Sequence, residues 1–166
     1  MARMEVGKGI EISMKIIANA SKSTTQMMKR AVYPVAGFMA DKISAALNSL
    51  PTVDGKNGKP PYARPGEKLS SISSIQKQDL IKSFGISRFE NQNGFINVKL
   101  GFNDYGSYPT KAHPKGIPNA LLIRSLEKGT NFLKKNNIIT KTVKENKTAA
   151  ERLLEENLKK IIEKEL

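Results

Sequence analysis

The sequence predicts an α+β fold: a small antiparallel β-sheet packed by a long N-terminal helix and a C-terminal amphipathic helix, with long loops. Three patterns predict this class. Apolar residues recur at helical spacing over residues 25–50, alternate with polar ones over 95–102, and form a second helical stripe after residue 148. The chain has 166 residues, the size of one domain. We therefore expect a single domain over residues 1–166.

The N-terminal third predicts one short strand and two helices. Residues 3–7 suit a short strand, with glycines after it as breaks. Apolar residues from Ile10 to Ile17 recur at spacings of three and four, which predicts a first helix. A second helix is expected over 25–50, where Pro34 should kink it or mark its restart.

Residues 51–76 predict an extended loop, because prolines and glycines punctuate a polar stretch that ends in a serine-rich run. Loops of this length inside a domain are usually functional or disordered. One hypothesis for this loop is that it folds only against a partner. Residues 79–84 then suit one or two helical turns.

A β-hairpin is the clearest local feature of the sequence. Residues 85–89 and 95–102 predict its strands, and in the second strand Ile96, Val98, Leu100 and Phe102 fall on one face. The Asn93-Gly94 pair suits the positive φ angles of a tight turn.

Two helices are expected after the hairpin, separated from it by a loop over residues 103–118. Asn119 is suited to cap a helix that runs to Lys128, and Gly129 is suited to end it. The last helix begins either at the capping-box pattern that starts at Thr148, or earlier, near Ile139, where the apolar stripe already runs.

The amino-acid composition excludes several classes of functional site. There is no Cys and a single His, so thiol chemistry, disulfide scaffolds and multi-His metal sites are excluded. We expect no metal and no cofactor. The chain has no run of eighteen apolar residues, so no membrane span is expected. Its first residues lack an apolar signal core, which predicts that it stays in the compartment that makes it.

The net charge of +13 permits attraction to a polyanion. The excess is spread along the chain at +4, +5 and +4 over residues 1–50, 51–118 and 119–166, and it comes from 22 Lys against 6 Arg. Lys acts as a point charge, whereas Arg forks onto phosphates and guanine edges. The charge therefore favours a solvated lysine-rich surface, and a basic nucleic-acid-binding module stays open as the alternative function.

An enzyme has little residue support. His113 lies in a loop rich in Pro and Lys and is expected to be exposed, because a general base also needs an orienting carboxylate and Asp104 is the nearest upstream. No phosphate-binding loop with Walker spacing is present in the sequence. We expect no catalytic residues, although His113 and Glu127 remain the candidates if the chain is an enzyme.

Three pieces follow one another in a recognisable order. They are a helix ending in Leu50-Pro51 before a polar loop, the segment Leu80-Ile81-Lys82-Ser83-Phe84 before the hairpin, and Leu126-Glu127-Lys128-Gly129-Thr130 after it. This order resembles the head–tail joining and tail-completion proteins of long-tailed bacteriophages.

The family's second piece is typically Thr-Gly-x-Leu-x-x-Ser-Ile, and its third is an aromatic-Ala pair, then a hydrophobe followed by Glu-x-Gly-Thr. The residues that match are Leu80, Ser83, Glu127, Gly129 and Thr130. Where the chain departs from the pattern, it has Lys77-Gln78 in place of Thr-Gly, Leu122-Ile123 in place of the aromatic-Ala pair, and Asn131-Phe132-Leu133 in place of a Pro-Phe element. We expect the matching residues to be architectural.

The resemblance implies a structural subunit without enzymatic activity. Such a subunit closes with copies of itself into a ring, usually of six, at the neck or top of the tail. The expected partners are the tail tube or tail-terminator protein, the head connector or a collar protein, and DNA where it passes through the ring. The expected location is the virion, after assembly in the host cytoplasm. The candidate partner contacts in the long loop are Lys56, Lys59, Tyr62, Arg64 and Lys68.

Overall fold

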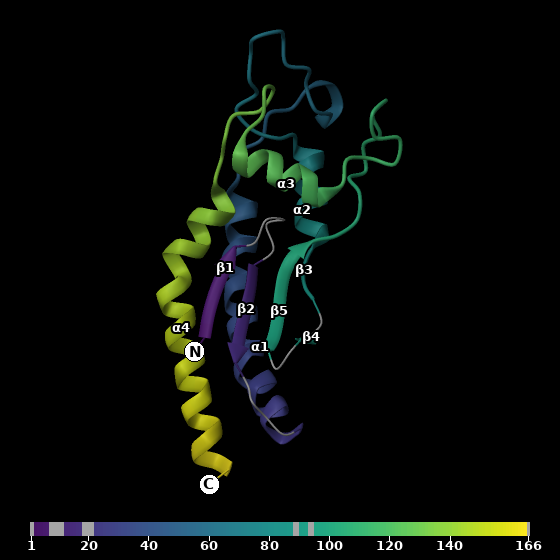
Figure 1. Ribbon diagram of the computed structural model, residues 1–166. Coiled ribbons are helices and arrows are strands. Elements are labelled where there is room, and N and C mark those ends of the chain that lie inside the picture. Colours follow the sequence, from purple (N-terminus) through teal and green to yellow (C-terminus); the bar gives the residue numbers. More distant parts are fainter. Residues whose placement is uncertain (1, 7–11, 18–21, 88–89, 93–94, 166) are drawn as a thin grey trace. The chain divides into compact units, whose positions relative to one another are not determined.

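The computed structural model describes residues 2–6, 12–17, 22–87, 90–92 and 95–165 (Figure 1). The chain forms two compact units. Unit 1 comprises Met1–Lys42, Ile86–Gly101 and Val143–Leu166, and unit 2 comprises Ile43–Gly85 and Phe102–Thr142. The two long helices, α1 and α4, each contribute residues to both units.

Unit 1 contains most of the antiparallel sheet. Strand β1 (Ala2–Val6) pairs with β2 (Ile12–Ile17), and β2 pairs with β5 (Phe95–Phe102). The short strand β4 (Glu90–Gln92) pairs with the other edge of β5, and β3 (Phe84–Ile86) completes the order β1-β2-β5-β3. Residues 84–85 of β3 and Phe102 of β5 belong to unit 2. The predicted α+β class is confirmed.

The second strand of the predicted hairpin is confirmed as β5, but the bounds of the first are wrong. The strand expected over 85–89 matches β3 only at residues 85–86, and the strand that pairs next to the turn is β4, whose Gln92 faces Phe95. The turn residues Asn93 and Gly94 lie outside the described part of the chain. Val98, Leu100 and Phe102 are buried, as their alternation predicts, while the side chain of Ile96 lies outside the described part.

The helix predicted from Ile10 to Ile17 is wrong, because residues 12–17 form β2. Ile12, Met14 and Ile16 also alternate with polar residues, so the segment suits both periods. Pairing with β1 on one side and β5 on the other favours the strand.

Helices α1 (Lys22–Ser49) and α4 (Ile138–Glu165) supply the apolar faces of unit 1. Helix α1 continues through Pro34 and buries Val32, Val35 and Met39 completely. In α4 the side chains of Ala150 and Leu154 are buried. The Asn157 amide donates a 3.2 Å hydrogen bond to the Ala31 carbonyl and so joins the two helices.

Unit 2 contains the end of α1, a short 3-10 turn (Lys56–Gly58), α2 (Ser74–Ser83) and α3 (Asn119–Lys128). The loop predicted over 51–76 ends at Ser73, earlier than expected. Ser73 and Gln76 form a reciprocal capping box, in which the Ser73 hydroxyl accepts from the Gln76 amide and the Gln76 side chain accepts from the Ser73 amide. The serine run thus starts a helix of ten residues where one or two turns were expected.

Helix α3 spans the predicted residues and ends at Gly129. Asn119 is not its cap, since Pro118 occupies the N-cap position and the Asn119 side chain donates 3.0 Å to the Asn103 carbonyl. Helix α4 begins at Ile138, which agrees with the earlier of the two predicted starts. The capping-box pattern at Thr148 therefore lies inside the helix.

Leu154 provides a test of the α4 packing in unit 1. Its side chain is 2% exposed, whereas Ile162 on the same helix is 49% exposed. Leu154→Ala should lower the free energy of unfolding by about 2–5 kcal/mol, because it deletes buried methyl groups and leaves a cavity. Ile162→Ala is the matched control and should change it by less than about 1 kcal/mol. Urea unfolding of both variants measures the difference, and equal losses would contradict the packing described.

Candidate functional site

The motif segment 126–130 organises the start of α4. The Glu127 side chain is only 5% exposed. Its Oε1 accepts from the Ile139 amide at 2.6 Å, and its Oε2 accepts from the Thr140 amide at 3.2 Å and the Thr140 hydroxyl at 2.7 Å. The first amides of a helix have no partner within the helix, and the helix dipole favours a negative charge there. Glu127 thus caps a helix that begins eleven residues further along the chain.

Gly129 and Thr130 shape the turn that follows α3. Gly129 has φ 74° and ψ 163°, a conformation restricted almost entirely to glycine. A Cβ atom there would lie 3.0 Å from the Lys135 backbone nitrogen. The Thr130 hydroxyl accepts from the Phe132 and Leu133 amides at 3.2 and 3.0 Å, and the Thr130 amide donates to the Leu133 carbonyl. Both residues therefore stabilise the chain reversal between α3 and α4.

The other two motif residues lie on α2. Leu80 is fully buried, and the Ser83 hydroxyl donates 3.1 Å to the Leu80 carbonyl. Lys77, which stands where the family has Thr, donates from Nζ to the carbonyls of Asn48 and Leu50, both at 2.8 Å. A lysine at the carboxyl end of α1 satisfies carbonyls that have no partner within the helix. The five motif residues thus stabilise local structure in unit 2 through burial and hydrogen bonds.

The candidate partner contacts in the long loop are exposed. Lys56, Lys59, Tyr62, Arg64 and Lys68 all face solvent, and Tyr62 is 96% exposed. The base of the loop is held in place: the Ser71 hydroxyl donates 2.6 Å to the Pro51 carbonyl, and the Ser74 amide donates 2.6 Å to Asp54 Oδ1. The Lys59 ammonium lies 5.6 Å from the centre of the Tyr108 ring. The loop therefore presents cations and one aromatic ring from an anchored base.

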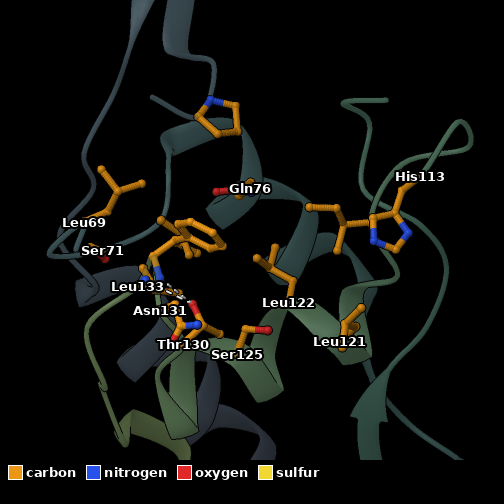
Figure 2. A pocket seen from close by; sticks show the side chains of 14 residues that line it. Leu69, Ser71, Gln76, His113, Leu121, Leu122, Ser125, Thr130, Asn131 and Leu133 are labelled. Atoms are coloured by element: carbon orange, nitrogen blue, oxygen red, sulfur yellow. Dashed lines mark hydrogen bonds between the residues drawn. The ribbon is translucent and has the colours of Figure 1, made fainter. Parts of the chain in front are cut away.

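A cavity of about 460 Å³ in unit 2 was not predicted from the sequence. Its apolar lining comes from the loop before α2, the loop before α3, α3 itself and the turn after α3, and consists mainly of Leu69, Ile72, Ile117, Leu121, Leu122, Phe132 and Leu133. Figure 2 shows Leu69 and Ser71 on one side, His113 on the other, and Ser125 of α3 below. Four separate segments meet here, so no local sequence pattern indicates the cavity.

His113 was expected to be exposed, but it is half-buried and lines this cavity. A tight turn holds it, in which its amide donates 3.0 Å to the Thr110 hydroxyl and its carbonyl accepts from the Thr110 and Gly116 amides. Glu127, the other enzyme candidate, directs both carboxylate oxygens at α4.

The positive charge is concentrated in unit 2. That unit holds thirteen Lys and Arg against five Asp and Glu, a net charge of +8, while unit 1 holds fifteen against ten, a net +5. Three of the five acids in unit 2 accept hydrogen bonds from backbone amides: Asp54 from Ser74, Asp79 from Ser107, and Glu127 from Ile139. The net positive charge, which is spread evenly along the sequence, is therefore larger in unit 2 than in unit 1.

Comparisons with protein-family models, curated proteins and solved structures found no match to this chain. Within the described residues, no three or more Asp, Glu or His side chains cluster as a metal site would require. No helix in that part of the chain is both long and apolar enough to cross a membrane.

The Glu127 cap can be tested with Glu127→Gln, which keeps the size of the side chain. Only one amide oxygen remains, so an NH₂ group must face a backbone N–H of Ile139 or Thr140 and leave it without an acceptor. The free energy of unfolding should fall by about 1–3 kcal/mol in urea titrations. Glu155→Gln, on the exposed surface of α4, should change it by less than about 0.5 kcal/mol. An unchanged midpoint for Glu127→Gln would refute the capping role.

Proposed function

We propose that this chain is a structural subunit of a phage or phage-tail-like particle. It forms a ring at the neck or top of the tail, where it completes or terminates the tail and joins it to the head connector or collar. In this proposal the chain catalyses no reaction and works in the virion.

The observation that carries the proposal is the use of the motif segment 126–130. Glu127 caps α4, and Gly129 and Thr130 shape the turn before it. The spacing of these three residues therefore has a structural explanation, because together they hold the start of the last long helix in place. This supports a structural role for the motif that the chain shares with the phage family.

The exposed loop supports the partner side of the proposal. A ring needs a heterologous interface, in which one surface of a subunit meets a different surface of its neighbour. Tyr62, almost fully exposed on an anchored loop, is a side chain of the kind that dominates binding energy at interfaces. Six copies of a +13 chain would also carry a charge suited to an acidic tube end or to DNA in transit.

Light scattering on the purified full chain, alone and mixed with purified tail tubes, tests the ring. We expect a species of about 110 kDa, six times 18.3 kDa, or a stoichiometric ring on tube ends. Tyr62→Ala should abolish this association at unchanged stability, while Tyr105→Ala, an exposed tyrosine outside the loop, should leave it intact. A strict monomer that binds neither tubes nor connectors would refute the proposal.

The net charge of +8 on unit 2 favours one alternative function, that of a basic nucleic-acid-binding module. This alternative is tested by titrating the chain with fluorescent duplex and single-stranded DNA at a series of salt concentrations. A nucleic-acid-binding module should lose affinity steeply and log-linearly with salt, because phosphate contacts release counterions. If no binding is measurable at low salt, this alternative is removed, and the light-scattering experiment alone decides on the ring.

A further inference from the structure

The cavity in unit 2 has an apolar interior that extends to the surface. Two of its lining side chains, Leu121 and Phe132, are 42% and 66% exposed, among the most exposed large apolar side chains in the described part of the chain. They continue the buried lining formed by Leu122 and Leu133 outward to solvent. Exposed apolar side chains that continue the lining of a cavity are typical of ligand-binding and partner-binding sites. The cavity volume of about 460 Å³ lies within the range of about 300–1,000 Å³ that is usual for ligand sites.

Cations flank this cavity in the sequence and face solvent. Lys59 adjoins the lining residue Pro60, Lys68 adjoins Leu69, and Lys134 adjoins Leu133. Within the described residues, no ion pair joins these three lysines to a carboxylate. Unit 2 as a whole, with all five of its acids counted, has a net charge of +8. The unit that contains the cavity is therefore net positive, and three of its exposed lysines adjoin lining residues in the sequence.

We propose that this cavity binds an extended acidic segment of a partner protein. A large apolar side chain of the segment, Leu or Phe, enters the cavity between Leu69 and Leu122 and contacts Phe132. Flanking carboxylates of the segment lie near Lys59, Lys68 and Lys134. The apolar contact supplies most of the affinity, and the charges supply orientation and the rate of encounter.

A second copy of this chain is the poorer occupant. Both units are net positive, at +5 and +8, and residues 143–166 of α4 hold six basic and six acidic side chains. A nucleic acid matches the charge, but the apolar lining is mainly Leu and Ile and leaves the polar edges of a base with few hydrogen-bond partners. Charge complementarity and cavity chemistry together thus select an acidic, apolar protein segment.

The inference does not rest on the ring. Occupancy of the cavity is a property of the isolated chain, so its failure and the failure of ring assembly are separate results. If the chain is a ring subunit, the acidic segment belongs to the adjoining tube, terminator or connector protein.

The test selects a random peptide library, displayed on phage, against the purified full chain. Enriched peptides should combine Leu or Phe with at least two Asp or Glu. The strongest, labelled with fluorescein, is then titrated by anisotropy. Ser125→Phe, which fills the cavity from α3, should weaken binding at least about tenfold, while Ala120→Phe, outside the lining on the same helix, should stay within about twofold.

Charge is tested in the same assay. The double variant Lys68→Glu/Lys134→Glu should also weaken binding at least about tenfold, whereas Lys159→Glu/Lys164→Glu, exposed on α4 in unit 1, should stay within about twofold. If Ser125→Phe does not fold, Phe132→Ala replaces it, since that ring is already largely exposed.

Three outcomes would overturn the proposal. The first is a selection that enriches no acidic, apolar peptides. The second is binding that neither the cavity-filling nor the charge variants weaken. The third is single-stranded DNA that binds the chain tightly and is the ligand that Ser125→Phe displaces, because the cavity would then accept a base rather than a protein side chain.

Discussion

The hydrogen bonds between the Glu127 carboxylate and the first turn of α4 hold the end of α3 next to the start of α4, and the turn between these helices depends on them. A carboxylate with 5% exposure is costly to bury unless its oxygens are satisfied, and here two backbone amides and one hydroxyl satisfy them. The same bonds supply partners for the otherwise unpaired amides of a helix of 28 residues. One side chain thus joins the end of α3 to the start of α4 and sets the register of the turn between them.

That turn also forms part of the cavity. Thr130, Asn131, Phe132 and Leu133 line it, and the backbone of Leu69 bonds to Phe132 and Lys134 on either side of Leu133. Gly129, with its positive φ, ends α3, and the segment that follows it lines the cavity together with Leu121, Leu122 and Ser125 of α3. The turn that leads to α4 and the proposed binding surface therefore use the same residues.

The acids of unit 2 link structure to charge. A carboxylate that accepts from backbone amides stabilises a loop or a helix start, as Asp54, Asp79 and Glu127 do. The lysines on the exposed loops face water instead. Unit 2 therefore combines a net charge of +8 with acids that also hold its own backbone in place, and the binding of an acidic segment proposed above relies on that charge.

The sequence by itself determined those helices and strands that depend on neighbouring residues only. The Asn119–Lys128 helix stops at Gly129 because glycine alone tolerates the φ and ψ required there, and Val98, Leu100 and Phe102 are buried because alternation places them on one face. The tertiary structure decided three other features. Residues 12–17 suit either period until β1 and β5 pair with them, and α4 starts at Ile138 because Glu127 approaches from another helix. The cavity forms where four segments that are distant in sequence pack together, and a pattern of neighbouring residues does not predict which distant segments will be in contact.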